Sequence, residues 1–310
     1  MINKSILLGL IVSASWAATS CNQTPKETAN SETITLHTSK GSVDAPKNPK
    51  NVVVFDMGTL ETFQDLGLSV AGIPKDFVAT QVHKYKVDAN VKDAGSIIQP
   101  NLELVSSIHP DLIIISDVIA SEYHKLSQIA PTLFLGTSKD DFTGSIIKNL
   151  KTIGQVYGIS EQTDKKSLVI QQKISDAKKK IKDSPKKLMI LMYNSGTLSS
   201  FGTESRYGFI FKDLGAKPAY RNTEKAIHGT IVSNELISKV NPDILYIIDR
   251  TLMMDGVALN RSEVENVLIQ RTNAYKTNNI HYLDPNVWYI SGGGTYSVNR
   301  MIDDILLGYK

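Results

Sequence analysis

The feature that most constrains the fold is an approximate internal repeat. Glu103–Asp117 reads ELVSSIHPDLIIISD and Glu235–Asp249 reads ELISKVNPDILYIID, and the two segments align without a gap. In each, apolar residues three and four apart predict a short helix, which ends at a Pro-Asp pair because proline disfavours helical backbone before it. The branched apolar run that follows predicts a strand buried on both faces, as in a parallel sheet. Two such units predict two lobes of related α/β construction.

Other strand patterns occupy comparable places in the two halves. Lys50–Phe55 and Lys187–Tyr193 open the halves, and Thr132–Leu135 and Ile280–Leu283 are predicted as late strands. Helical patterns lie between these strands, and such alternation favours parallel sheets with crossover helices. We therefore expect an α/β protein with two Rossmann-like lobes, each with a parallel central sheet, and a ligand cleft between the lobes.

A long amphipathic pattern lies between the halves. Ile170, Ile174, Ala177 and Ile181 recur at helical spacing, and most other residues from 161 to 184 are polar or charged. This predicts one backbone helix of about 23 residues, roughly 34 Å long at 1.5 Å per residue. Its lysine run at 178–180 is interpreted as a solvated face rather than a nucleic-acid or membrane patch.

The N-terminus has the pattern of an export signal. Lys4 is followed by a mostly apolar stretch, Ser5–Ala18, which is too short to span a bilayer comfortably. A run of small residues then ends at Cys21, the only cysteine in the chain. A single cysteine cannot form an internal disulfide, and the segment resembles a bacterial lipobox in which Cys21 is lipidated. Ordinary signal cleavage before a bystander thiol is the alternative.

These signals divide the chain. We predict a signal peptide at 1–20, a lipidated cysteine and flexible tether at 21–33, an N-terminal lobe at 34–158, a connecting helix at 159–185 and a C-terminal lobe at 186–310. With 41% hydrophobic and 21% charged residues, the lobes have an ordinary globular composition. The small net charge of +3 gives no nucleic-acid footprint. We expect a monomer, because each lobe can bury its own sheet.

The order of tether, lobe, single long helix and lobe resembles the helical-backbone class of substrate-binding proteins. These proteins serve ABC importers of siderophores, haem and cobalamin. The segments SSFGTESRYGFIFKDLG and YLDPNVWYISGGG resemble the catecholate-siderophore branch of that class. The resemblance implies a periplasmic lipoprotein that binds a ferric catecholate siderophore as its transported ligand, without a permanent cofactor, and delivers it to a permease and its ATPase. It implies no enzymatic activity, and haem or cobalamin binding and a non-transport surface lipoprotein remain the alternatives.

Two arginines are candidates for binding an anionic ligand. Arg250 follows directly after a predicted strand end, and Arg206 lies in the turn-like GTESRYG segment. Guanidinium groups suit ferric catecholates because they are permanently charged, weakly hydrated and able to stack on rings. Position alone leaves surface ion pairs open for both residues. The resemblance implies that both lie in the ligand cleft.

The repeat also exposes a difference between the lobes. Val118 occupies the place in the first unit that Arg250 occupies in the second. The resemblance implies an arginine there in many catecholate binders. Either the ligand carries less negative charge than those of such binders, or Lys84, His124 or Lys125 supplies the positive charge that the missing arginine would give.

His228 and Tyr289 form a candidate metal-ligating pair. Imidazole nitrogen and phenolate oxygen are both good ligands for iron(III). Ordinary polar packing is the alternative for each. The resemblance implies that the pair completes the coordination of Fe(III) in a tetradentate bis-catecholate. Trp288 and Tyr207 could line the cleft beside them, or could pack in the core.

Glu103 and Glu235 begin the two repeat helices. A carboxylate at a helix N-terminus is favoured by the helix dipole, so capping alone could explain both. The resemblance implies that one glutamate per lobe docks on the permease. The glycine run Gly292–Gly294 lacks the Gly-Lys-Ser/Thr ending of a phosphate-binding loop and is interpreted as a cleft-lining loop.

Overall fold

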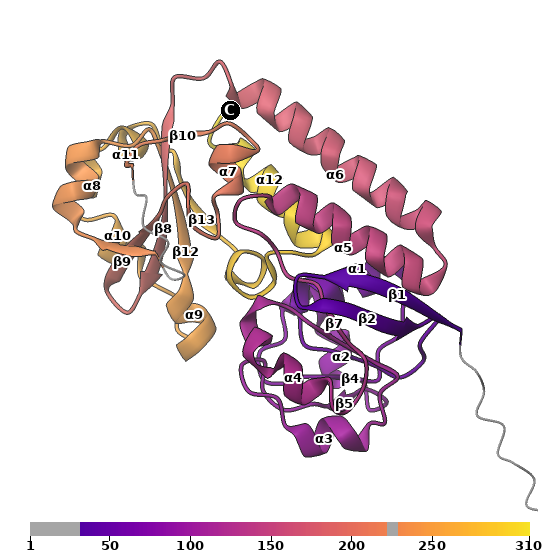
Figure 1. Cartoon of the computed structure of the whole chain (residues 1–310). Helices are drawn as coiled ribbons and strands as arrows, with labels where there is room; N and C mark the ends of the chain where they lie inside the picture. The colour runs from indigo at the N-terminus through magenta and orange to yellow at the C-terminus, as the bar shows by residue number, and fades with distance from the viewer. Residues whose placement is uncertain (1–31, 222–228) are drawn as a thin grey trace, which may run out of the picture. The chain divides into compact units, whose positions relative to one another are not determined.

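Two β-sheets organise the part of the chain that this computed structural model describes, residues 32–221 and 229–310 (Figure 1). The first sheet is built from five strands in the order β5-β4-β3-β6-β7, and every strand pair in it is parallel. Its strands are β3 (Val52–Val54), β4 (Gly72–Ile73), β5 (Lys92–Asp93), β6 (Leu112–Ile115) and β7 (Thr132–Phe134). We call the elements from β1 to α5 the N-terminal lobe.

Helices connect the strands of the N-terminal lobe, and a hairpin precedes them. The hairpin pairs β1 (Thr33–Thr38) with β2 (Gly41–Pro46). The α-helices are α1 (Met57–Leu66), α2 (Lys84–Val87), α3 (Leu102–Ser107), α4 (Tyr123–Leu126) and α5 (Phe142–Tyr157), and the 3-10 turns are η1 (Thr80–Val82) and η2 (Asp117–Glu122). The parallel sheet predicted for this lobe is confirmed.

The second sheet is mixed, which corrects the expectation of a parallel sheet. Strands β8 (Lys187–Asn194), β12 (Ile244–Asp249) and β13 (Ile280–Leu283) are parallel, but β9 (Thr197–Phe201) runs antiparallel to β8. The physical reason is a two-residue hairpin turn at Ser195 and Gly196, whose φ angles of 46° and 86° match the turn type that joins antiparallel strands. The edge strand β11 (Thr230–Val232) and the short β10 (Lys217–Pro218) complete the sheet.

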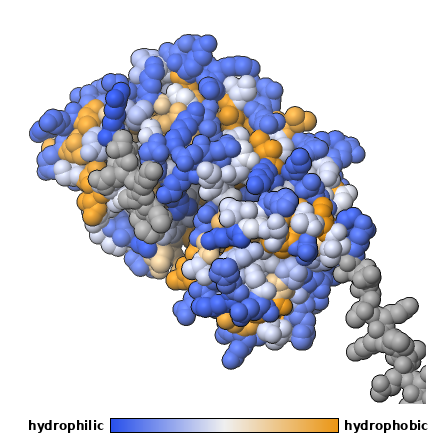
Figure 2. All heavy atoms as spheres, viewed as in Figure 1, coloured by the Kyte–Doolittle hydropathy of each residue, from blue (hydrophilic) through white to orange (hydrophobic). Residues whose placement is uncertain are grey.

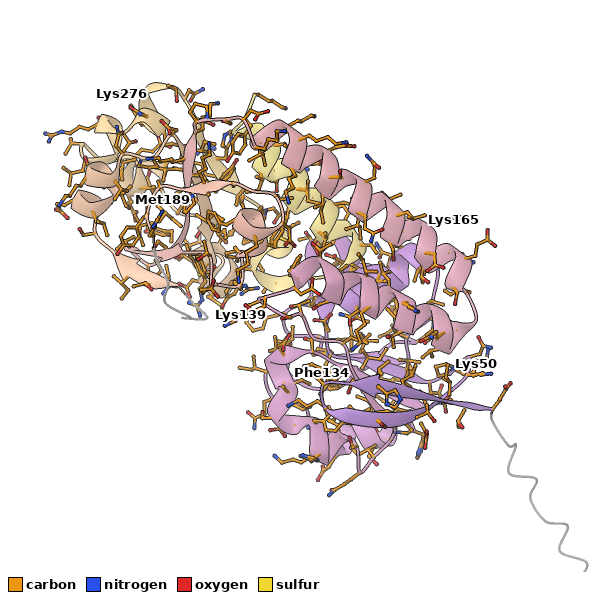
Figure 3. The ribbon with its side chains drawn as sticks, turned by 45° about the horizontal axis from the view of Figure 1, so that its top comes forward. Lys50, Phe134, Lys139, Lys165, Met189 and Lys276 are labelled. Carbon is orange, nitrogen blue, oxygen red and sulfur yellow. The ribbon has the colours of Figure 1, made fainter. Side chains whose placement is uncertain are left out.

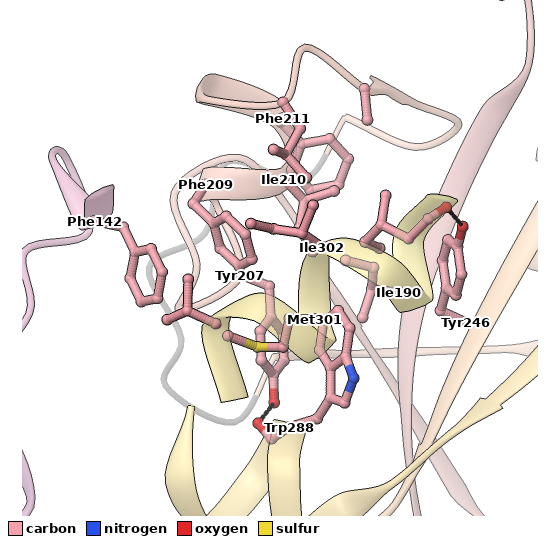
Figure 4. Packing of buried hydrophobic residues seen from close by; sticks show 14 of the residues in the cluster. Phe142, Ile190, Tyr207, Phe209, Ile210, Phe211, Tyr246, Trp288, Met301 and Ile302 are labelled. Carbon is pink, nitrogen blue, oxygen red and sulfur yellow. Dashed lines mark hydrogen bonds between the residues drawn. The ribbon is translucent and has the colours of Figure 1, made fainter. Parts of the chain in front are cut away.

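The elements from β8 to α12 form the C-terminal lobe. Its α-helices are α7 (Phe209–Lys212), α8 (Asn234–Val240), α9 (Arg250–Asp255), α10 (Arg261–Val264), α11 (Asn273–Lys276) and α12 (Thr295–Leu307). A 3-10 turn, η3 (Ile269–Arg271), and a π-helical turn, η4 (Asn286–Ser291), lie between them. The lobe's main core lies between the sheet and the helices α5, α6, α7 and α12, and Figure 4 shows part of its packing.

The internal repeat is visible in the backbone. A residue with left-handed backbone lies directly before each proline, His109 (φ 51°) shortly after α3 and Asn241 (φ 48°) at the C-cap of α8. The following carboxylates act alike, since Asp111 accepts backbone N–H groups from Lys50 and Asn51, and Asp243 accepts that of Lys187. Each Pro-Asp pair therefore ends a helix and anchors the start of the neighbouring strand.

A single long helix, α6 (Ser160–Ile181), separates the two lobes in the sequence. It buries the predicted stripe Ile170, Ile174, Ala177 and Ile181 and packs beside α5 and α12 (Figure 1). The lysine run at 178–180 is exposed, as the solvated-face interpretation expects. Figure 3 shows Lys165 projecting from the same helix, where it pairs with Glu161 at 2.7 Å.

The surface agrees with an ordinary globular composition. Figure 2 shows mostly hydrophilic side chains, with apolar ones scattered between them. Within residues 32–221 and 229–310, no helix combines the length and the apolar character that crossing a membrane requires. The predicted signal peptide, Cys21 and most of the tether lie outside the described residues.

Candidate functional site

Arg250 is presented by the end of an inner strand of the C-terminal sheet. Strand β12 ends at Asp249, whose carboxylate accepts the backbone N–H of Leu252 at 3.0 Å and so caps α9. The same carboxylate accepts the N–H of Leu259 at 2.8 Å, which ties down the loop after α9. Ligands of α/β sheets sit beyond the carboxyl ends of strands, and this is where the fold places Arg250.

Two hydrogen bonds hold the Arg250 side chain in place. Its Nε donates to the Tyr289 hydroxyl at 2.9 Å, and its Nη1 donates to Asn194 Oδ1 at 2.7 Å. Asn194 was not predicted as a site residue. The available signal was its position as the first polar residue after the apolar run of β8, at the same edge of the sheet as Arg250.

Arg206 approaches Tyr289 from a second direction. It lies in the loop between β9 and α7, and its Nη2 donates to the backbone carbonyl of Tyr289 at 3.1 Å. Its guanidinium carbon lies 5.6 Å from the centre of the Tyr289 ring, and that of Arg250 lies at the same distance. The structure therefore brings together three predicted site residues, with one half-buried phenol between two guanidinium groups.

The local backbone around Tyr289 is unusual. Tyr289 lies in the π-helical turn η4, between β13 and α12. Single π-turns are rare and occur often at functional sites, because the wider turn displaces side chains from their regular helical positions. Gly292 ends the turn with a φ of 67°, and a Cβ added there would lie 3.7 Å from Arg206 Nη2.

Trp288 and Tyr207 are buried, which favours the packing interpretation over the cleft-lining one. Trp288 is 0% exposed and its Nε1 donates to Asp304 at 2.9 Å. Tyr207 is 2% exposed and its hydroxyl donates to the Trp288 carbonyl at 2.7 Å (Figure 4). Burial raises the pKa of Tyr207 above its ordinary value. A ligand cannot reach either ring in this structure, so we interpret both as core residues that pack next to Tyr289 and Arg206.

The remaining predicted site residues are either exposed elsewhere on the two lobes or not described by the structure. His228 and Cys21 lie outside the described residues. Glu103 and Glu235 are exposed in the first turns of α3 and α8. Hydrogen bonds from its own backbone N–H and from the Ser233 hydroxyl lower the pKa of Glu235.

The carboxyl edge of the N-terminal sheet carries different side chains from that of the C-terminal sheet. Val118 is 59% exposed just after β6, and the sequence contains no arginine before Arg206. The Asp56 carboxylate caps α1 at the same edge, and burial raises its pKa, with a smaller contribution from the nearby Asp117 charge. The strongly cationic groups at this candidate site thus come from the C-terminal lobe.

The residues proposed to compensate for Val118 have local partners. Lys125 pairs with Glu122 at 2.8 Å, and the Lys84 ammonium lies 4.8 Å from the centre of the neighbouring Tyr85 ring. His124 contacts the ring of Tyr123 edge-on.

The described residues contain a further large cavity, which is separate from the two arginines. This cavity of about 710 Å³ lies among α1, α6 and α12, and its lining contains neither Arg206 nor Arg250. In the described part of the chain, no three His, Cys, Asp or Glu side chains gather as a metal site.

Known proteins share this fold and much of this sequence. Residues 52–287 match the periplasmic binding protein family. The petrobactin-binding protein YclQ of Bacillus subtilis is 38% identical over 280 residues, covering 90% of this chain and 88% of the relative. The ferric-anguibactin-binding protein FatB of Vibrio anguillarum is 33% identical over 89% of this chain and 88% of its own length.

Solved structures agree with these relatives. The crystal structure of YclQ superposes with a TM-score of 0.86 at 37% identity, covering 90% of this chain and 99% of that one. The structure of BauB, bound to a complex between two acinetobactin molecules and ferric iron, gives a TM-score of 0.85 at 32% identity over the same shares. The family consists of binding proteins rather than enzymes, and both relatives named above are siderophore-binding proteins. This chain belongs to the periplasmic binding protein family.

Proposed function

We propose that this chain is the substrate-binding lipoprotein of an ABC importer, which captures ferric catecholate siderophores and delivers them to an inner-membrane permease. The observation that carries the proposal is Tyr289, held between Arg206 and Arg250 at the carboxyl edge of the C-terminal sheet. The guanidinium groups attract anionic catecholate oxygens and stack on aromatic rings. The phenol oxygen offers iron(III) a hard ligand within the same cluster.

The relatives support a ferric siderophore as the transported ligand. Their names include a petrobactin-binding and a ferric-anguibactin-binding protein, and BauB was solved with two acinetobactin molecules around one ferric ion. The similarity covers most of each chain, and the family match at residues 52–287 includes both arginines.

His228 and Tyr289 are proposed to complete the iron coordination of a tetradentate bis-catecholate. Such a ligand leaves two of the six positions around iron(III) open, whereas a hexadentate tris-catecholate leaves none. A metal-bound phenolate at Tyr289 would lie beside the Arg250 guanidinium, which stabilises its charge. The N-terminal lobe offers Val118 at the equivalent edge, which suits a ligand of lower net charge than a tris-catecholate.

A fluorescence and absorption titration tests this assignment. Wild type and a His228→Ala/Tyr289→Phe double variant are titrated with ferric bis-catecholate and ferric tris-catecholate. Trp288, the residue before Tyr289, serves as the fluorescent reporter. We expect the double variant to lose affinity and phenolate-to-iron absorption for the bis-catecholate alone. If wild type and the double variant show the same affinities and the same absorption, His228 and Tyr289 do not coordinate the iron. If wild type binds neither complex, the proposed siderophore-binding function is wrong.

Membrane attachment and docking are part of the same proposal. Cys21 is proposed to carry the lipid anchor, in the periplasm, and the protein to act as a monomer. Glu103 and Glu235, one exposed on each lobe, are proposed to dock on the permease. We expect a Glu103→Arg/Glu235→Arg variant to keep its ligand affinity and to lose siderophore uptake in cells. The exposed Glu161→Arg change on α6 is the matched control, and equal uptake by both variants would contradict the docking role.

A further inference from the structure

The segment that carries Tyr289 is held by both lobes. By sequence the turn η4 belongs to the C-terminal lobe, yet the N-terminal lobe binds both of its ends. At its first residue, Asn286 Oδ1 accepts the backbone N–H of Thr80 at 3.2 Å. At its last residue, Ser291 Oγ accepts a hydrogen bond from Gln81 Nε2 at 3.0 Å. Both donors come from the short turn η1.

A buried carboxylate fixes the position of Gln81. The Glu61 side chain on α1 is 2% exposed, and its Oε1 accepts a second hydrogen bond from Gln81 Nε2. Its Oε2 accepts the backbone N–H of Ser297 at 3.0 Å, at the N-terminus of α12. One carboxylate thus satisfies groups of both lobes, and the Gln81 amide bridges it to Ser291.

Glycines allow the two lobes to approach this closely. A Cβ on Gly58 of α1 would lie 2.7 Å from the Gly294 backbone nitrogen, and a Cβ on Gly294 would overlap the Glu61 carboxylate. Thr62 adds a further link, because its hydroxyl accepts the N–H of Thr295 at 3.3 Å. Gly294 is therefore a packing contact between α1 and the start of α12.

We propose that Gln81 is a positioning residue for Tyr289. This inference rests on the proposed role of Tyr289 as an iron ligand. Gln81 holds the end of the π-turn, two residues beyond Tyr289. Arg206 holds the backbone carbonyl of Tyr289, and Arg250 holds its phenol oxygen. An iron ligand displaced by about 1 Å loses most of its bond, so the bridge matters only for ligands that need Tyr289.

Substitutions in this bridge should weaken the binding of one class of ligand and spare the other. Gln81→Leu removes the hydrogen bonds of the amide to Glu61, Ser291 and Thr80. Ser291→Ala removes the contact of the amide with the π-turn and leaves the amide itself in place. We expect each to weaken ferric bis-catecholate binding by about tenfold or more and to shift the phenolate-to-iron absorption band. Binding of ferric tris-catecholate should change by less than about threefold, because its iron needs no protein ligand. Thr62→Val, which loosens the same lobe contact away from the π-turn, should leave both affinities near wild type.

We test the positioning role of Gln81 by titrating the wild type and these variants with both ferric complexes. Thermal unfolding checks that each variant is folded. If wild type shows the absorption band and the Ser291→Ala variant matches it in both affinities, Gln81 has no positioning role. An equal loss for both ligands, or an equal loss in Thr62→Val, indicates a general structural role and also overturns the inference. If wild type shows no band, the proposed iron site itself fails, which is a separate result.

Discussion

The Arg250 Nε donates a 2.9 Å hydrogen bond to the Tyr289 hydroxyl, which ties the end of β12 to the π-turn η4. The phenol oxygen accepts this bond, so its remaining lone pair and its own proton are left for a ligand. Asn194 holds the same guanidinium at Nη1. The cation is thus oriented before any ligand arrives, which lowers the entropy cost of binding.

Arg250→Gln should weaken binding of a ferric catecholate by about 10- to 100-fold, because a hydrogen bond to a charged group contributes about 1.5–3 kcal/mol. The dependence of affinity on salt should also become shallower, since one cation no longer faces the anionic ligand. Isothermal titration at several ionic strengths measures both effects. Arg271→Gln makes the same charge change at an exposed position on η3 and is the matched control. Equal losses in the two variants would mean that overall charge, and not this cluster, attracts the ligand.

Trp288→Phe should lower the free energy of unfolding by about 1–3 kcal/mol, measured by chemical denaturation. The reason is that Asp304, 4% exposed, would lose the indole N–H that now donates to it at 2.9 Å. Burial already raises the pKa of Asp304, and the indole contact counteracts that effect. A double-mutant cycle with Asp304→Ala, which removes the acceptor, isolates the pair, and a coupling energy near zero would contradict this account.

Gly294→Ala and Gly293→Ala make a sharp comparison between adjacent positions. A methyl group on Gly294 would overlap the Gly58 carbonyl and the Glu61 carboxylate, while one on Gly293 would lie 3.7 Å from Thr137, at ordinary contact distance. We expect Gly294→Ala to cost about 1–3 kcal/mol of stability, as overpacking usually does, and Gly293→Ala to cost little. Thermal and chemical unfolding of both variants test this. Equal tolerance would show that α1 and α12 can separate freely.

Local patterns in the sequence predict much of this fold. The repeat around Pro110 and Pro242 predicts a helix and a strand in each lobe, and the stripe along α6 predicts the connecting helix. Both depend on short-range spacing that the structure preserves. The antiparallel strand β9 was not predicted because its sequence, TLSSF at Thr197–Phe201, contains only two apolar residues and does not resemble a buried strand. The Ser195-Gly196 turn before it lies among polar residues, which is also the pattern of an ordinary loop.

The site was predicted in part. Position in the sequence made Arg250 and Arg206 candidates, and the resemblance implied a binding role for both and for Tyr289. The structure brings these three residues together. Asn194, Gln81 and Glu61 were not predicted because their partners lie far away in the sequence. Gln81 and Ser291, for example, are 210 positions apart. Only the tertiary structure makes such contacts visible.

Glu61→Gln should reveal the titration of the buried carboxyl in the lobe contact. Burial is the largest influence on Glu61 and raises its pKa above the ordinary value of 4.5. The folded protein therefore holds this proton to a higher pH than the unfolded chain does. The contribution of Glu61 to stability is complete below about pH 4.5 and is lost as the pH rises through the folded pKa. The unfolding free energy of wild type minus that of Glu61→Gln should accordingly fall with rising pH.

Denaturant unfolding of both proteins between about pH 4 and pH 8 measures this difference. Thr62→Val is the matched control, because it alters the same contact between α1 and α12 without a titratable group. Its difference from wild type should stay constant with pH. Hydrogen bonds from Gln81 and from Ser297 act in the opposite direction to burial and lower the pKa of Glu61. A difference that rises with pH for Glu61→Gln would therefore mean that these hydrogen bonds outweigh burial, and that the ionised carboxylate is what holds the two lobes together.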